Sequence, residues 1–91
     1  MRITFDPAKN EKNITERGLS FDLAGELDWE TAFIVEDDRR DYGETRLRVL
    51  ALLKGRLHVA VVTTRKDELR IISFRKANRK EEKLYEYHPK T

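Results

Sequence analysis

Five basic side chains fall within residues 70–80, a segment that begins like a buried strand and ends like a solvated helix: Arg70, Arg75, Lys76, Arg79 and Lys80. An arginine guanidinium presents a planar fork of donors that matches phosphate oxygens, and it keeps its charge at physiological pH. The cluster therefore predicts a site for an anion. The competing interpretation is an ordinary polar edge exposed to solvent.

His58 is the candidate partner of Arg75. If the strands on either side of RKDE pair with Thr64 opposite Leu69, His58 lies across from Arg75. An imidazole exchanges protons near neutral pH, so it could act as general acid or base beside a bound phosphate. The alternative is a polar cross-strand pair that performs no chemistry.

The distribution of charge and the absence of cysteine limit the kinds of partner and metal site that the protein can have. The net charge is +2, but residues 65–91 carry nine Lys or Arg against five Asp or Glu, which favours an anionic partner for the C-terminal part. The chain has no cysteine, which excludes a disulfide and a thiolate metal site. The acidic run at 36–44 includes two arginines and matches no metal-binding loop, so we predict no metal and no cofactor.

The strands that must position these residues are predicted at 2–5, 31–36, 45–53, 56–64 and 69–75. The last three are joined by short connections, which favours neighbouring antiparallel strands. We therefore predict one α+β domain over residues 1–91, with a small antiparallel sheet of about four to five strands. Two N-terminal helices and one C-terminal helix complete the predicted fold.

The predicted helices have recognisable ends. An Asp-Pro pair at 6–7 opens the first helix, and Gly18 ends it after about Arg17. Ser20 can cap a second helix, whose apolar residues recur at a spacing of three. The third helix is predicted over 78–87, with Asn78 as N-cap and Glu81 as its capping-box partner.

The pairing register decides which side chains share a face. A three-residue KGR loop would pair Leu53 with Leu57. One face would then hold an apolar core under the helices: Leu47, Val49, Ala51, Leu53, Leu57, Val59, Val61, Ile72 and Phe74. The other face would be open and cationic, with Arg46, Arg48, His58 and Arg75. A two-residue Lys54-Gly55 turn would shift this register by one and move His58 to the other face relative to strand 45–53.

Three segments resemble the BrnT-type toxins of bacterial type II toxin–antitoxin systems. They are FDPAKNEKNITERGLSF (5–21), DYGETR (41–46) and RIISFRKANRKEEKLYE (70–86). The resemblance implies a RelE-like fold and a ribonuclease toxin that cleaves RNA and inhibits translation and growth. It also implies neutralisation by a BrnA-type ribbon-helix-helix antitoxin in a heterotetramer, with DNA contacted only through the antitoxin.

The resemblance also indicates site residues. The basic motif positions of the family correspond to Lys9, Arg46, Arg65 and Arg75. Many relatives read Lys-His-Gly where this chain has Glu16-Arg17-Gly18, so His58 becomes the only internal imidazole. We predict that the catalytic residues are Lys9, Arg46, His58, Arg65 and Arg75, and that Lys76, Arg79 and Lys80 bind RNA.

The predicted reaction is metal-independent RNA cleavage. The 2′-hydroxyl of the substrate can attack the adjacent phosphate while basic residues orient that phosphate and stabilise its developing charge. Proton transfer could fall to His58, Lys9, Glu36 or Glu44. The alternative function is a non-catalytic nucleic-acid- or protein-binding module with a basic patch. With no signal peptide or apolar span in the sequence, we expect a cytoplasmic location without membrane contact.

Overall fold

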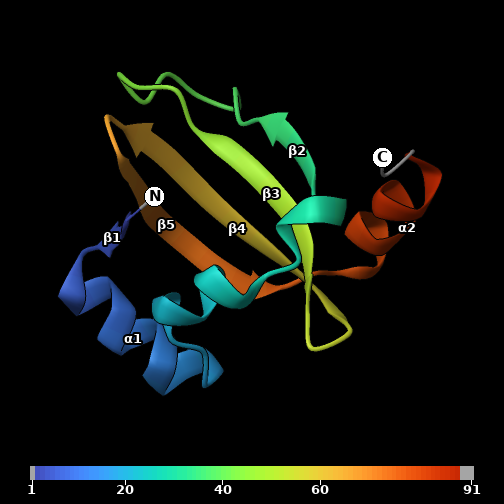
Figure 1. Cartoon of the computed structure of the whole chain (residues 1–91), viewed down its shortest axis with the longest axis horizontal. Coiled ribbons are helices and arrows are strands. Elements are labelled where there is room, and N and C mark those ends of the chain that lie inside the picture. Colours follow the sequence, from blue (N-terminus) through green and yellow to red (C-terminus); the bar gives the residue numbers. More distant parts are fainter. Residues whose placement is uncertain (1, 89–91) are drawn as a thin grey trace.

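A computed structural model describes residues 2–88, and it confirms the α+β fold class (Figure 1). The elements along the chain are β1 (Arg2–Phe5), α1 (Pro7–Arg17), the 3₁₀ helices η1 (Phe21–Glu26) and η2 (Trp29–Thr31), β2 (Phe33–Glu36), β3 (Leu47–Leu53), β4 (Arg56–Arg65), β5 (Glu68–Lys76) and α2 (Arg79–Tyr87). No helix within residues 2–88 is both long enough and apolar enough to cross a bilayer.

The sheet has five strands in the order β1-β5-β4-β3-β2. Strands β2 to β5 pair in antiparallel fashion, but β1 runs parallel to β5, with Ile3 opposite Leu69. The prediction of a purely antiparallel sheet is therefore wrong at this edge. Short connections determine the pairing of consecutive strands, whereas β1 joins the last strand of the chain, which no local pattern indicates.

The prediction of two N-terminal α-helices is correct only for α1. The Asp6 side chain accepts the Ala8 N–H at 2.9 Å, and Gly18 ends the helix in a left-handed conformation with φ 64°. Residues 21–26 instead form the 3₁₀ helix η1, which Ser20 caps. The physical reason lies in the spacing of three, because side chains at i and i+3 eclipse in a 3₁₀ helix and present one continuous apolar edge.

The turn between β3 and β4 contains two residues, so the three-residue alternative is wrong. Lys54 and Gly55 have φ of 50° and 80°, as the tight hairpin turn requires, and Leu53 pairs with Arg56. In the next hairpin the predicted pairing of Thr64 with Leu69 is confirmed. A bulge between Val61 and Val62 then shifts the ladder.

The bulge adds one residue to β5. Val62 pairs with Ile71 and Val61 with Ser73, so Ile72 is the extra residue. Beyond the bulge, His58 pairs with Lys76 and not with Arg75. The predicted opposition of His58 and Arg75 is therefore wrong, because regular alternation was assumed across the whole hairpin.

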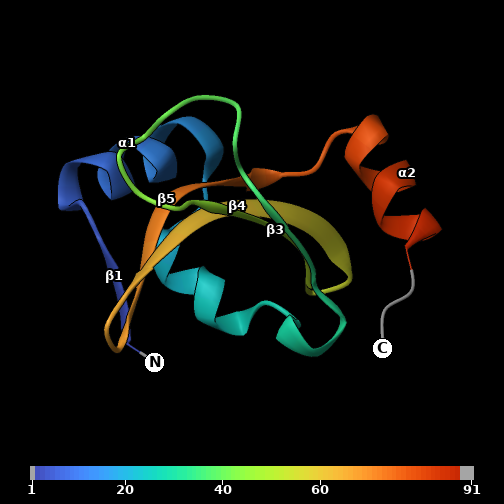
Figure 2. The same cartoon turned by 90° about the horizontal axis from the view of Figure 1, so that it is seen from above.

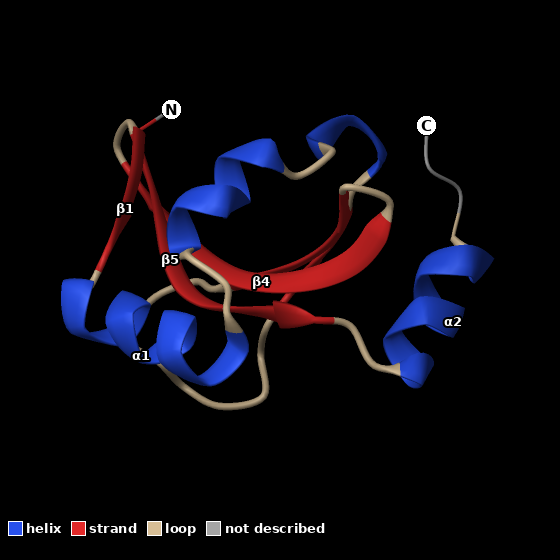
Figure 3. Ribbon diagram, turned by 90° about the horizontal axis from the view of Figure 1, so that it is seen from below, coloured by secondary structure: helices blue, strands red, loops and turns tan. Residues whose placement is uncertain are grey.

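Two apolar clusters lie on opposite faces of the sheet. The larger cluster joins the inward residues of β3, β4 and β5 to Phe21, Ala24 and Leu27 of the η1 region. The smaller contains Leu50, Leu57, Val59 and Ala77, with Leu84 and Tyr85 of α2 packed against it. Figures 2 and 3 show the 3₁₀ helices on one side of the sheet, with α1 and the 37–46 loop on the other. The predicted single core face is wrong for Leu57, Val59 and Val61, because the two-residue turn reverses their side relative to β3. It is also wrong for Ile72, the extra residue of the bulge, which belongs to neither cluster of the described residues.

Candidate functional site

A hollow of about 440 Å³ lies on the α2 side of the sheet. Four basic side chains from different elements line it: Arg39 of the 37–46 loop, Arg48 of β3, Arg75 of β5 and Lys80 of α2. Asn78, Glu81 and Leu84 complete the lining. We call this site the arginine hollow.

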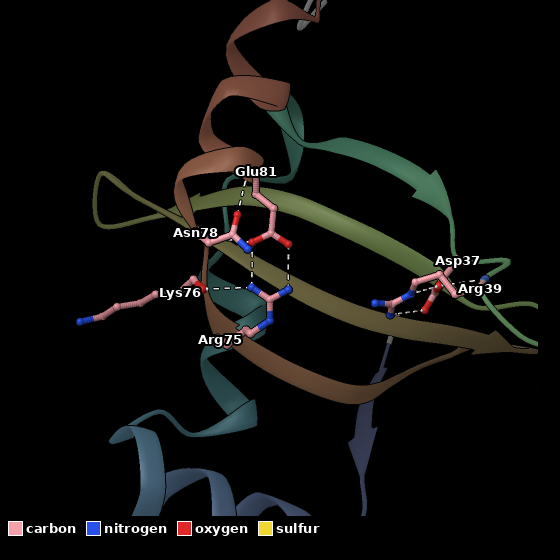
Figure 4. Close-up of polar contacts among 6 residues, drawn as sticks. All are labelled: Asp37, Arg39, Arg75, Lys76, Asn78 and Glu81. Carbon is pink, nitrogen blue, oxygen red and sulfur yellow. Dashed lines mark hydrogen bonds and ion pairs between the residues drawn. The ribbon is translucent and has the colours of Figure 1, made fainter.

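Arg75 forms a two-pronged ion pair inside the arginine hollow (Figure 4). Its Nη1 and Nη2 donate to Oε1 and Oε2 of Glu81 at 2.8 and 2.7 Å. Nη1 also lies 3.3 Å from the carbonyl oxygen of Lys76. The neighbouring Phe74 is buried in the larger cluster, so strand alternation directs Arg75 to the opposite face. The guanidinium is thereby fixed in orientation while about a third of its side chain stays exposed.

Glu81 links this arginine to the start of α2. Its Oε1 also accepts the Asn78 N–H at 2.9 Å, and its own N–H donates to Asn78 Oδ1 at 2.9 Å, which confirms the predicted capping box. The ion pair with Arg75 lowers the pKa of Glu81 against the opposing effect of burial. The same pair raises the pKa of Arg75. Both groups are therefore charged at neutral pH.

Arg48 brings a second guanidinium to the arginine hollow, and it was not among the predicted site residues. It lies on β3 opposite Val61, and its charge contributes to the lowered pKa of Glu81. Its Nε is buried and donates to no acceptor within the part of the chain that the structure describes. A buried donor without an acceptor is costly to the fold.

Arg39 is the most exposed arginine of the hollow. Its Nε and Nη2 donate to the two oxygens of Asp37 at 2.7 and 2.9 Å, and Asp37 is itself buried. The hydrogen bond from Arg39 lowers the pKa of Asp37 to about 2. The hydrogen bonds to Glu81 raise the pKa of Arg75, whereas the positive charge of Arg39 repels that of Arg75 and acts to lower this pKa. Four cations face two carboxylates here, so the arginine hollow keeps an excess of positive charge.

A basic surface continues from Arg75 toward α1. Arg75 and Lys76 line a second hollow, of about 430 Å³, together with Arg17 at the end of α1. Arg17 and Lys9 line a third, of about 200 Å³, along α1. Asn13 holds α1 in place by donating to the carbonyl oxygen of Phe74 at 2.9 Å. Lys9 therefore joins the surface around Arg75 through Arg17, which was not a predicted site residue.

Arg46 and Arg65 form a separate group at the other end of the sheet. Arg46 Nε and Arg65 Nη2 lie 3.3 and 2.9 Å from the two carboxylate oxygens of Glu44. Arg46 also stacks over the Tyr42 ring, with its Cζ 4.0 Å from the centroid. Arg65 is six residues along β4 from the partner of Arg75, roughly 20 Å at about 3.3 Å per residue. The structure does not bring these two arginines to Arg75.

His58 faces away from the arginine hollow. Its ring lies 5.6 Å from that of Phe74, its Nδ1 is 2.8 Å from the Arg56 carbonyl oxygen, and only 4% of the residue is exposed. Burial lowers the pKa of this imidazole. The predicted contact between His58 and Arg75 is wrong, because the bulge places the two side chains on opposite faces.

The predicted RNA-binding residues divide between two places. Lys80 lines the arginine hollow, whereas Lys76 is exposed and points away from the Arg75–Glu81 pair (Figure 4). Arg79 is exposed at the first position of α2. The predicted open face already includes Arg48 with Arg75, and this shared face could have indicated Arg48 as a site residue. No local signal indicated Arg39, which reaches the hollow through a loop.

The chemistry of the arginine hollow suits a phosphate group, because forked donors and excess positive charge converge on one recess. Within residues 2–88, no three His, Cys, Asp or Glu side chains gather as metal ligands would. A sequence model of one protein family, described as ribonuclease toxin, BrnT, of type II toxin–antitoxin system, matches residues 5–81. No curated protein matches the chain.

Proposed function

Since the chain belongs to the BrnT family of ribonuclease toxins of type II toxin–antitoxin systems, we propose that it is an endoribonuclease whose arginine hollow binds the scissile phosphate of RNA. One observation supports this assignment above the others. Arg75 and Arg48 come from different strands to the same recess, and Glu81 already holds the Arg75 guanidinium there. Two guanidiniums that converge on one recess offer the forked donors that match phosphate oxygens.

RNA cleavage by the 2′-hydroxyl of the substrate requires few protein groups. The 2′-hydroxyl loses its proton and its oxygen attacks the adjacent phosphorus, while the bond to the 5′ oxygen breaks. That 5′ oxygen takes up a proton, so a 2′,3′-cyclic phosphate and a free 5′-hydroxyl result, and both protons can be exchanged with water. Negative charge grows on the non-bridging oxygens as the reaction proceeds, so guanidiniums fixed in advance stabilise the transition state. Arg75 meets this need, because Glu81 already fixes its orientation. No metal ion enters this scheme, and cleavage is expected in the presence of EDTA.

The other basic residues extend the proposed RNA surface. Lys80 flanks the phosphate in the arginine hollow, and Arg17, Lys76 and Lys9 continue the path along α1. Arg46 and Arg65 would contact a more distant part of the strand, near Glu44. His58 has no role in this proposal, because its ring is buried on the opposite face.

The test is cleavage of a defined RNA by the purified protein in EDTA, repeated with translating ribosomes. Wild type is compared with Arg75→Ala and with Arg56→Ala, which removes an exposed arginine outside the three basic hollows. We expect cutting by wild type and Arg56→Ala, and loss of at least about a hundredfold in Arg75→Ala. Full activity in folded Arg75→Ala would remove Arg75 from the mechanism. Binding without cutting under both conditions would favour a non-catalytic binding module.

The family implies an antitoxin partner as well as an RNA substrate. We propose that this antitoxin is of the BrnA type, with a ribbon-helix-helix domain that dimerises and gives a heterotetramer. We also propose that the fold is RelE-like. Light scattering on the co-expressed complex tests the stoichiometry, and a 1:1 complex of two chains would contradict it.

A further inference from the structure

Glu81 is an unexpected group to find in a site for phosphate. It is 8% exposed, lies within the arginine hollow, and holds both Nη groups of Arg75. A fixed carboxylate repels an incoming phosphodiester, so it weakens RNA binding unless it contributes something else.

Capping of α2 does not account for this arrangement. The capping box uses one side-chain oxygen, Oε1, which accepts the Asn78 N–H. A glutamine at the same position could supply that oxygen, since Glu and Gln both serve in capping boxes. The second oxygen, Oε2, contacts Arg75 Nη2 at 2.7 Å. The ion pair therefore uses the second carboxylate oxygen and the negative charge of glutamate, which the capping of α2 does not need.

The geometry points to Glu81 as a positioning residue for RNA cleavage: we propose that its carboxylate holds the Arg75 guanidinium in the orientation that receives the scissile phosphate, at the expense of RNA affinity. This inference rests on the proposed function. Arg75 has donors left beyond those that Glu81 occupies, because a guanidinium carries five N–H groups in one plane. A clamp at both Nη atoms fixes that plane and the direction of the remaining donors.

Glu81→Gln separates the two effects. The amide keeps an acceptor for Asn78 and removes one negative charge from the arginine hollow. Its NH₂ group, however, would face Arg75 Nη2 as donor against donor, so Arg75 loses its second anchor. The variant is expected to bind RNA more tightly and to cleave it more slowly. A merely structural role would weaken binding and cleavage together.

Two measurements are made on folded protein. Affinity is measured with a 2′-O-methyl RNA, which has no free 2′-hydroxyl to attack the phosphate. The single-turnover cleavage rate is measured with unmodified RNA of the same sequence. For Glu81→Gln we expect an affinity about two- to fivefold higher than wild type, and a cleavage rate lower by about tenfold or more.

Glu82→Gln is the matched control. It removes the same charge from the same first turn of α2, but Glu82 is exposed and does not line the arginine hollow. Its cleavage rate should stay within about twofold of wild type. If Glu81→Gln does not fold, Glu81→Asp replaces it, since aspartate keeps the charge and loses one methylene of reach. In Glu81→Asp we expect an RNA affinity equal to that of wild type. The cleavage rate should be at most about one fifth of the wild-type rate.

The outcomes distinguish the two proposals. If wild type cuts no RNA with or without ribosomes, the proposed function fails, and the role of Glu81 fails with it. If wild type cuts and folded Glu81→Gln cuts equally fast, only the role of Glu81 is overturned. Weaker binding together with slower cutting in Glu81→Gln also overturns it, because that pattern indicates general damage to the hollow.

Discussion

Replacing Arg75 with glutamine should destabilise the fold in a way that depends on pH. The substitution leaves Glu81 buried without the guanidinium that now contacts both of its oxygens. Loss of one partner of a fully buried pair costs about 3–5 kcal/mol, whereas exposed pairs contribute about 0–1 kcal/mol. The side chains of Arg75 and Glu81 are 34% and 10% exposed, so solvent screens the pair in part.

The expected loss lies between these limits, at about 2 kcal/mol in the free energy of unfolding at neutral pH. For a domain of this size each kcal/mol shifts the melting temperature by about 4–8 °C, which predicts a decrease of roughly 8–16 °C. Arg79→Gln is the matched control, because Arg79 is exposed at the adjacent start of α2. Its effect should stay within about 0.5 kcal/mol.

The pH dependence of the stability loss in Arg75→Gln shows whether the unpaired Glu81 carboxylate causes it. The Arg75 pair lowers the pKa of folded Glu81 below its ordinary value of 4.5, so this stabilisation is present above 4.5 and is lost as pH falls through the folded pKa. The difference between wild type and Arg75→Gln should therefore be full at about pH 7 and shrink as pH falls below 4.5. Urea unfolding followed by circular dichroism measures the free energy of unfolding of wild type and Arg75→Gln at neutral and at acidic pH.

A double-mutant cycle completes the test. In Arg75→Gln with Glu81→Gln the buried carboxylate is gone, so the double variant should be more stable than Arg75→Gln alone at neutral pH. Equal stability losses at neutral and acidic pH would refute the reasoning, since Glu81 is then not the group left unpaired. A melting temperature equal to that of wild type would refute it as well.

Three further predictions follow from the same structure. Asn78→Ala should lower the stability by about 1 kcal/mol in urea unfolding, because it removes the α2 cap; an unchanged midpoint would contradict this. Burial lowers the pKa of His58 below 6.5, so the stability of wild type should decrease as pH falls below that value. The stability of His58→Asn should decrease less over the same pH range, and this variant should still cleave RNA. Abolished cleavage would return His58 to the mechanism. Arg48→Gln should reduce the slope of log affinity for 2′-O-methyl RNA against log salt by about 0.7, and an unchanged slope would show that Arg48 meets no phosphate.

The sequence alone determined the features that depend on neighbours along the chain. An Asp-Pro pair and Gly18 delimit α1, and Asn78 with Glu81 opens α2, because caps satisfy backbone groups within a few residues. The five strands were predicted close to their observed bounds from their β-branched and apolar runs. Arg75 was also singled out, since its residue type and its place at the end of a strand suffice to suggest a phosphate ligand.

Tertiary structure alone decided which side chains meet Arg75. One residue more or less in a turn or a ladder reverses every following side chain. The bulge at Val61/Val62 therefore put His58 and Arg75 on opposite faces, and the two-residue turn at Lys54 put His58 on the opposite face from Arg48. Arg39 reaches the hollow through a loop, at a separation that no local pattern records, and Arg48 lies on β3, which β4 separates from β5. Glu81 was predicted as a cap, and only the packing of α2 against the smaller apolar cluster made it the partner of Arg75 as well. Local sequence sets local conformation, whereas the convergence of distant residues depends on a register that is fixed when the whole sheet packs.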